Sequence, residues 1–304
     1  MVCWGIGATG ISVGRTTIES EMNQDIKNIL TIDIEEYFHS PAFNALFGMD
    51  RWPLLESRMV FEANKILGIL DEFKVTATFF ILGWIAERFP EIIKEIHARG
   101  HEIACHGYSH RFVYKLTPAE FRWEVEYTME LLNGLGGETV QGYRAPAFTI
   151  TDDSLWALDI LAEMGFKYDA SIYPIYRPRY GIPSCERFMH RINAGDHSLV
   201  EIPASTITMF GRNWPVAGGG YLRLFPYSFT RWAIRKINAE GQPAVVYFHP
   251  EEVDPDQPRL KPDPKNRFTH YVGLGTTENK LRRLLQDFSF GPIRDFMPAF
   301  DAGV

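Results

Sequence analysis

Short apolar runs alternate along this chain with longer segments of helical periodicity, and this alternation restricts the possible folds more than any other feature. Such an alternation is typical of βα units arranged around a parallel sheet. The run Ala244–Phe248 is apolar throughout, as expected of a parallel strand that helices cover on both faces. The pattern therefore predicts an α/β fold, with strands at residues 29–34, 77–82, 102–105, 142–144, 198–202 and 244–248.

Helices are expected between these runs. Residues 58–73 place four apolar side chains on one stripe, and Thr117-Pro118-Ala119-Glu120 forms a capping box with proline at the first helical position. Residues 174–196 show no strong periodicity and are expected to form long loops. A Pro- and Asp-rich stretch predicts an extended crossing at residues 254–265, and further helices are predicted at 152–164, 228–238 and 277–288.

Composition and charge limit the class of protein. The chain has 304 residues, 45% of them hydrophobic, which is enough for one large core or two modest ones. A net charge of −7 argues against a broad surface for nucleic acid. No run approaches the roughly 18 apolar residues of a transmembrane helix. Residues 1–27 lack the basic start of a secretory signal and are interpreted as a flexible leader outside the fold.

The three cysteines, Cys3, Cys105 and Cys185, are too scattered for a disulfide framework or a zinc knuckle. We interpret them as free thiols, which fits a reducing compartment. Together with the missing signal, they predict a cytoplasmic protein.

The first strand carries unusual acidic residues. Asp33 lies inside the apolar run, and Glu35 and Glu36 follow it. Acids are poor strand residues, and three in four positions would repel one another in a low-dielectric site. A bound cation would relieve that repulsion. A strand that ends in a solvated acidic turn explains Glu35 and Glu36 equally well, whereas a lone acid inside a strand needs a partner.

The pentapeptide His106-Gly107-Tyr108-Ser109-His110 closes the third predicted strand. If this segment takes one helical turn, both imidazoles face the same way and reach a single metal ion. Two neutral histidines and one carboxylate leave open positions for water and substrate on a divalent metal. Taken alone, the pair is also explained as a solvated turn.

Two further predicted strands end in residues that could take part in a reaction. Arg144 precedes Ala145-Pro146, which keeps it extended, and its guanidinium could form a forked pair with a carboxylate such as Asp33. His249 ends the run Ala244–Phe248 and is a candidate proton donor, because its charge changes near neutral pH. A surface arginine and a core histidine are the alternative interpretations.

In this order, the motifs resemble the polysaccharide deacetylase family, also called the NodB-homology or carbohydrate esterase family 4 proteins. The resemblance is carried by Thr31-Ile32-Asp33-Ile34-Glu35, His106-Gly107-Tyr108-Ser109-His110, Arg144-Ala145-Pro146, Tyr168-Asp169 and Phe248-His249. A closer resemblance is to the bacterial deacetylases encoded with exopolysaccharide and exosortase-type gene clusters. Its carriers are residues 33–39, Gly218-Gly219-Gly220-Tyr221-Leu222-Arg223, Tyr247-Phe248-His249-Pro250 and residues 252–259.

The resemblance implies a distorted (β/α) barrel of TIM-like type, with the site at the C-terminal strand ends. It implies one divalent metal, Zn²⁺ by preference, held by Glu35, His106 and His110. The family usually places the metal-binding acid directly after the catalytic base, where this chain has Ile34. Glu35 shares a strand face with Asp33 and takes that role here, with Glu36 as its rival.

The resemblance also implies catalytic roles. Asp33 would be the general base, Arg144 its partner, and His249 the general acid oriented by Asp169. The backbone N–H near Ala147 would bind the oxyanion. The glycines that follow Ala217 do not fit a dinucleotide fingerprint. They predict either a flexible turn or a loop that approaches a sugar, with Tyr221 stacking on it and Arg223 contacting an acidic group.

The implied function is metal-dependent hydrolysis of N-acetyl groups on amino sugars, in a polysaccharide or its lipid-linked precursor. Partners would be an N-acetylated glycan and proteins of an exopolysaccharide pathway. Two alternatives remain at this point: a sugar deformylase or allantoinase-like amidohydrolase on the same fold, and a non-catalytic carbohydrate-binding relative. The catalytic domain is expected at residues 28–260, with residues 261–304 packing on the barrel as an extension.

Overall fold

The computed structural model describes residues 26–43, 46–136, 139–216 and 218–301. Residues 1–25 of the predicted leader, Cys3 included, lie outside this range. One sheet dominates the fold, and seven of its strands form a continuous path in which every neighbouring pair is parallel. Their spatial order is β10 (Val245–Phe248), β1 (Asn28–Ile34), β2 (Thr78–Ile81), β3 (Glu102–Cys105), β4 (Gly142–Tyr143), β5 (Tyr168–Asp169) and β7 (His197–Glu201).

The sheet curls so that its two ends approach each other. Ser205, four residues after β7, accepts a hydrogen bond at 2.7 Å from the backbone N–H of Val245 at the start of β10. A side chain thus spans the gap between the first and last parallel strands. The fold is a distorted (β/α) barrel, as the sequence predicts.

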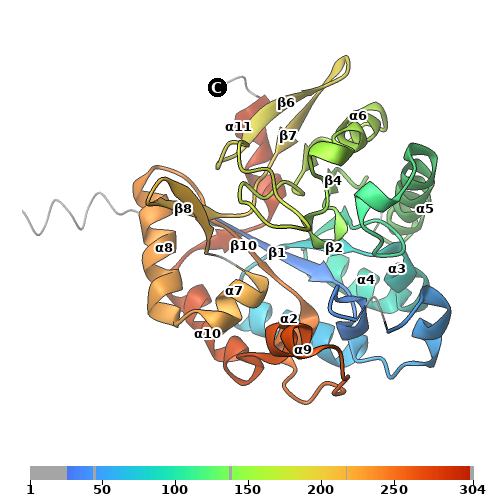
Figure 1. The fold of residues 1–304 in the computed structure, drawn as a ribbon, viewed down its shortest axis with the longest axis vertical. Helices are drawn as coiled ribbons and strands as arrows, with labels where there is room; N and C mark the ends of the chain where they lie inside the picture. The colour runs from blue at the N-terminus through green and yellow to red at the C-terminus, as the bar shows by residue number, and fades with distance from the viewer. Residues whose placement is uncertain (1–25, 44–45, 137–138, 217, 302–304) are drawn as a thin grey trace, which may run out of the picture.

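Four strands lie outside this parallel path. β6 (His190–Ala194) pairs antiparallel with β7, and β11 (Phe290–Gly291) pairs in parallel with β1. β8 (Thr206–Met209) and β9 (Arg212–Pro215) form a separate hairpin that contacts α8 (Figure 1). Because β11 comes from the segment after residue 260, that segment contributes to the same sheet as the rest of the barrel.

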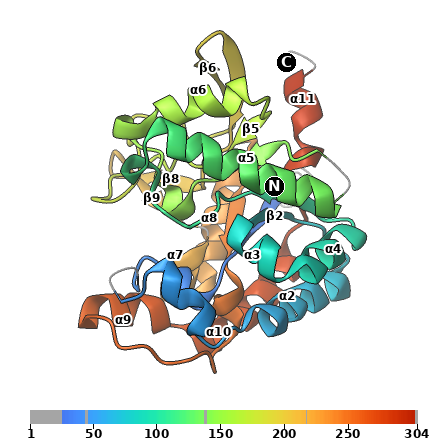
Figure 2. The same ribbon diagram turned by 90° about the vertical axis from the view of Figure 1, so that its right-hand side faces the viewer.

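Helices surround the sheet, and in both views α5 and α6 lie above β2 whereas α2 and α10 lie below it (Figures 1 and 2). Among the described residues, none of the helices combines the length and the apolar character needed to span a bilayer. The α-helices are α2 (Met59–Phe73), α3 (Gly83–Arg88), α4 (Pro90–Ala98), α5 (Pro118–Gly136), α6 (Trp156–Glu163), α7 (Gly219–Leu224), α8 (Tyr227–Ala239), α9 (Pro264–Tyr271), α10 (Leu274–Asp287) and α11 (Met297–Asp301).

The side chains of β1 alternate between two buried environments, because successive residues of a strand point to opposite faces. Leu30, Ile32 and Ile34 belong to the large apolar cluster that includes the helices. Ile29 belongs to a second cluster with inward-facing residues of the other strands, such as Phe80 and Ala104. Asp33 and Glu35 follow Ile29 at even spacing, so the same alternation directs both carboxylates inward at the C-terminal end of β1.

The structure contains all six predicted strands and all five predicted helices, with boundaries shifted by a few residues. The long loops expected at residues 174–196 include β6, which the weak periodicity of the segment did not reveal. The helices α3, α4, α7, α9 and α11 were not predicted. α7 is informative, because it begins within the Gly218-Gly219-Gly220 run that had suggested a flexible turn.

Candidate active site

The site lies at the C-terminal ends of four parallel strands. β1 carries Asp33 and leads into Glu35, and β3 leads into His106 and His110. Arg144 follows β4 and His249 follows β10. These six predicted residues meet in space, and all except His249 are almost fully buried.

Glu35, His106 and His110 form a compact set of possible metal ligands. One ligand atom from each residue lies within 4.8 Å of the other two, and Glu35 Oε2 is 2.5 Å from His110 Nε2. The predicted helical turn is absent. Instead Gly107 and His110 take positive φ angles of 72° and 52°, and this irregular loop brings the two imidazoles together.

The surroundings of His106 prepare it to bind a metal. Its Nδ1 lies 2.7 Å from the backbone carbonyl oxygen of Arg144, which can only accept a hydrogen bond. Nδ1 therefore carries the proton, and Nε2 keeps its lone pair for a ligand. Burial lowers the pKa of His106 to about 4, so the ring is neutral at pH 7. Two imidazoles and one carboxylate fit a divalent transition metal with open positions.

Glu35, rather than Glu36, faces the histidines. Burial opposes ionisation of Glu35, but the nearby histidines, above all His110, hold the pKa of this carboxyl well below its usual range. Glu36 points elsewhere: it accepts hydrogen bonds from the Ser57 hydroxyl and, at 3.1 Å, from the Arg58 backbone N–H. Glu36 therefore anchors the start of α2.

Asp33 is held by a buried ion pair. Arg144 Nη1 donates to Asp33 Oδ1 at 2.7 Å and to the Thr31 hydroxyl at 2.7 Å, while Nε donates to the Ala170 carbonyl at 3.1 Å. The Arg144 guanidinium also lies 4.2 Å from the centre of the Phe80 ring. With Oδ1 engaged in this way, Asp33 Oδ2 is oriented towards His249, whose Nε2 lies 3.8 Å away.

His249 is surrounded by acids. Its Nε2 is 3.6 Å from Glu35 Oε1, and its Nδ1 is 3.5 Å from Glu252 Oε2. Burial alone would lower the pKa of His249, but Glu251, Glu252 and Glu35 together raise it well above its ordinary value of 6.5. The raised pKa favours the protonated ring, which can donate a proton.

The acid beside the His249 ring is Glu252, whose Oε2 lies 3.5 Å from Nδ1, rather than the predicted Asp169. Asp169 accepts hydrogen bonds from the Ser171 hydroxyl at 2.5 Å and from its backbone N–H at 3.1 Å. Ser171 Oγ in turn accepts from the Ala145 N–H at 2.7 Å, so Asp169 supports the loop after β4. The sequence carried a signal for Glu252: in His249-Pro250-Glu251-Glu252 the proline starts a one-turn helix, and the acid three positions on caps the His249 N–H at 3.1 Å.

Arg223 does not reach outward to a substrate. The guanidinium is buried, lies 3.1 Å from Glu252 Oε1, and donates to the backbone carbonyls of His270 and Thr269. Arg223 therefore neutralises and fixes the acid beside His249. The sequence interpretation of a contact with an acidic substrate group is replaced by this internal contact.

Tyr221 and the glycines before it line an aromatic cluster beside the site. A Cβ on Gly218, which has a φ of +115°, would lie 2.3 Å from the Tyr247 ring, so glycine is required for this close approach. Tyr221 bonds through its hydroxyl to Tyr180 at 2.8 Å and to Arg177 Nε at 3.0 Å. Ala147 is half-buried, with a positive φ of 52°, in the loop that follows Arg144.

Glu251 is a buried acid to which the sequence analysis gave no role. It is 4% exposed, and its Oε2 makes no hydrogen bond. Burial is the main reason that its pKa rises to about 8. Its position directly after His249-Pro250 was the only signal in the sequence.

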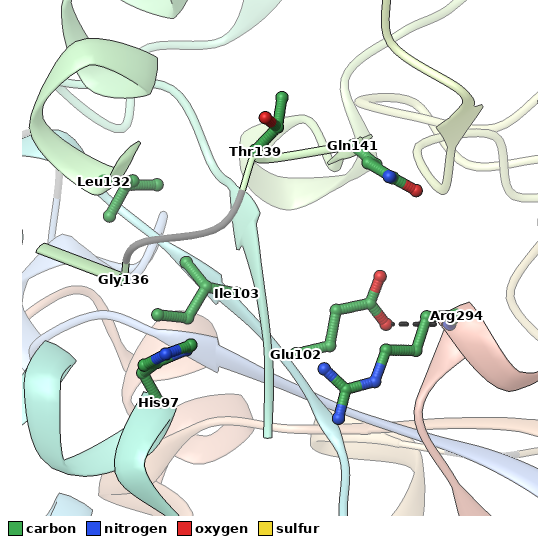
Figure 3. Close-up of a pocket in the computed structure, with 8 residues that line it drawn as sticks. All are labelled: His97, Glu102, Ile103, Leu132, Gly136, Thr139, Gln141 and Arg294. Carbon is green, nitrogen blue, oxygen red and sulfur yellow. Dashed lines mark hydrogen bonds between the residues drawn. The ribbon is translucent and has the colours of Figure 1, made fainter. Parts of the chain in front are cut away.

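The hollow drawn in Figure 3 belongs to the opposite end of the barrel. It measures about 360 Å³, and Glu102 and Gln141, at the beginnings of β3 and β4, line it with Arg294. Glu102 accepts from the Arg294 N–H at 2.9 Å, from Thr78 and from Tyr168, so its carboxylate is fully engaged in joining these elements. This end of a βα barrel serves stability rather than chemistry.

Two family models match the chain in succession. Residues 59–168 match the model described as polysaccharide deacetylase, and residues 170–298 match a domain of unknown function (DUF3473). The boundary between the matches falls at β5, inside one continuous sheet. The two matched regions therefore build a single barrel.

Curated relatives are deacetylases. The peptidoglycan-N-acetylglucosamine deacetylase of Bacillus cereus is 42% identical over 96 residues, which are 31% of this chain and 35% of the relative. The peptidoglycan deacetylase of Helicobacter pylori is 29% identical over 46% of this chain and 52% of the relative. The chain thus spans about a third to a half of the length of these two relatives.

Solved structures share the fold. A polysaccharide deacetylase from Mycobacterium smegmatis matches with a TM-score of 0.58 at 21% identity, covering 92% of both chains. An allantoinase matches with a TM-score of 0.61 at 15% identity, covering 90% of both chains. At these identities, the likeness concerns the barrel itself.

Proposed function

We propose that this chain, residues 59–168 of which match the polysaccharide deacetylase model, is a metal-dependent hydrolase that removes N-acetyl groups from the amino sugars of a polysaccharide or its lipid-linked precursor. One observation carries this proposal: His249, paired with Glu252, has its Nε2 within 3.8 Å of both Asp33 and Glu35. Asp33 is paired with Arg144, and Glu35 lies beside His106 and His110. A base, an acid and a set of metal ligands therefore converge at one point.

Amide hydrolysis at neutral pH lacks both a strong nucleophile and a good leaving group. A divalent metal, for which we propose Zn²⁺, would be held by Glu35, His106 and His110, and would supply a more acidic water and a polarised carbonyl. The protein must then accept one proton from the attacking water and give one to the departing amine.

Asp33 is the proposed proton acceptor. The Arg144 guanidinium engages Oδ1, so Oδ2 remains to receive the proton. The backbone N–H of Ala147 is the proposed donor to the carbonyl oxygen as it gains negative charge.

His249 is the proposed proton donor to the leaving nitrogen. Glu252 fixes its ring through Nδ1, and Arg223 in turn holds Glu252. This chain of contacts leaves Nε2 facing the reaction centre, where Asp33 and Glu35 lie within 3.8 Å.

Product analysis tests the proposed reaction. Zinc-loaded protein should release acetate from N-acetylated oligosaccharides, over a panel that varies the sugar and the chain length. Formate would indicate a deformylase and ammonia an allantoinase-like reaction, and either would replace the proposal. Binding of the glycans without any release would identify a non-catalytic relative.

The proposed role of His249 as proton donor predicts how kcat/KM depends on pH. Because the pKa of His249 is raised, the protonated ring persists above pH 6.5, and kcat/KM should fall only at more alkaline pH as the proton is lost. In His249→Ala the rate should be lower by about 10²–10⁴-fold, and the alkaline limb should disappear. The variant should still bind the metal held by Glu35, His106 and His110. An unchanged pH profile in the variant would remove His249 from the mechanism.

We also propose that the protein works in the cytoplasm, on a glycan precursor with proteins of an exopolysaccharide pathway. Cys105 and Cys185 are free thiols in the structure, which is compatible with a reducing compartment. Fractionation of native cells tests this location. Recovery of a processed form in the periplasm or medium would contradict it.

A further inference from the structure

A second set of metal-ligating side chains lies next to the first and shares Glu35 with it. Glu35, His249 and Glu251 each offer a ligand atom, and these atoms all lie within 4.8 Å of one another. Their donors are one imidazole nitrogen and two carboxylates, a combination that binds divalent transition metals. Among the described residues, these are the two groupings of this kind.

The two oxygens of Glu35 point to different partners. Oε2 lies 2.5 Å from His110 Nε2, on the side of the first set, whereas Oε1 lies 3.6 Å from His249 Nε2, on the side of the second. A carboxylate oriented in this way can bridge two ions. In two-metal sites, the ions lie about 3.5–4 Å apart.

Glu251 supplies an independent indication of a ligand. Its side chain is buried, and Oε2 makes no hydrogen bond. An unpaired buried oxygen is costly, because it has lost water without gaining a donor. A cation at this point would compensate both Glu251 and the facing oxygen of Glu35.

We propose that Glu35, His249 and Glu251 form a second, weaker divalent-metal site whose occupation inhibits the enzyme. The inhibitory part rests on the proposed function. The second site is weaker because it offers one imidazole where the first offers two, and because the His249 side chain is 20% exposed while those of the first site are almost fully buried.

Inhibition follows from the position of the ion. A metal on His249 Nε2 would use the lone pair to which the transferable proton must bind. The proton donor would be lost while Asp33 and the first ligand set stay intact. Excess zinc bound at this second site would therefore lower the turnover rate.

Metal stoichiometry tests the site without reference to activity. Metal-free protein would be titrated with Zn²⁺ by calorimetry, and bound zinc would be counted by elemental analysis after equilibrium dialysis. Wild type should bind two ions with different affinities, whereas Glu251→Gln should bind only the tighter one. Glu91→Gln is the matched control, because this exposed residue on α4 pairs only locally with Lys94; it should bind two ions.

The same titration followed by acetate release tests the inhibitory part. Wild-type activity should rise to a maximum at one equivalent and then fall by about 10²-fold or more as the second site fills, since a general acid contributes about 10²–10⁴-fold. In Glu251→Gln, the ratio of activity at excess zinc to activity at one equivalent should stay near unity.

The outcomes separate this inference from the proposed function. One ion per wild-type chain, with acetate release intact at excess zinc, would overturn the second site and leave the deacetylase proposal standing. Two ions in both wild type and Glu251→Gln would also overturn the assignment to Glu251. Two ions in wild type and one in the variant, without acetate release from any substrate, would support the site and refute the proposed reaction.

Discussion

The Asp33→Asn variant is expected to lose about 10²–10⁴-fold in kcat while it keeps its metal. The amide of asparagine cannot accept the proton from water, but it retains the shape of the carboxylate. Glu35, His106 and His110 are unchanged, so metal content should match that of the wild type. Steady-state kinetics on N-acetylated oligosaccharides and elemental analysis of the same preparation measure both quantities.

Folding must be measured alongside activity, because the substitution leaves Arg144 buried without its carboxylate partner. Breaking one side of a buried pair costs about 3–5 kcal/mol of stability, so the melting temperature should fall. Kinetics should therefore be recorded well below that temperature.

Glu36→Gln is the matched control: this neighbouring acid bonds to Ser57 and Arg58, and its loss should leave kcat near the wild-type value. Near-normal turnover in Asp33→Asn would make Asp33 a structural residue.

Removal of the metal is expected to abolish acetate release, and Zn²⁺ should restore it. The ion contributes several kcal/mol of transition-state stabilisation, and each 1.4 kcal/mol or so is about tenfold in rate, so a loss of about 10²-fold or more is expected. His110→Ala should show the same loss without rescue, because one of the three ligands is missing.

His101→Ala is the control for the histidine substitution, since His101 lies at the start of β3 and its Nδ1 accepts from the Ala77 N–H at 3.2 Å. It should bind zinc as the wild type does. Activity that is insensitive to chelators, in protein shown to be metal-free, would refute the proposed role of the metal.

The strands could be predicted because their signal is local. A parallel strand covered on both faces is apolar throughout, and the spacing of Asp33 and Glu35 already placed both on one face. The same argument separates Glu35 from Glu36, and the structure agrees with it. Short helices such as α3 and α7 span six residues each, too few for periodicity to indicate them.

The contacts between distant segments could not be predicted in the same way. The sequence predicted a helical turn at residues 106–110. In the structure, positive φ angles at Gly107 and His110 bring the two imidazole rings together instead. Arg223 turns inward because Glu252, 29 positions further along the chain, lies beside it. Pairings of this kind depend on how loops pack after the barrel has closed, and no spacing within one segment encodes them.

Arg144 joins three neighbouring parts of the barrel wall, since it follows β4 and bonds to β1 and to Ala170 after β5. Its side chain is fully buried. Arg144 therefore both orients the proposed base, Asp33, and holds neighbouring strands together. A substitution at this position would change the orientation of the base and the stability of the barrel at the same time. New substrate preferences would have to arise in the segments beside the site, such as the loop bearing Tyr180 and the helix α7 bearing Tyr221. We expect homologous enzymes with different glycan substrates to differ in sequence in these segments and to keep the buried arginine.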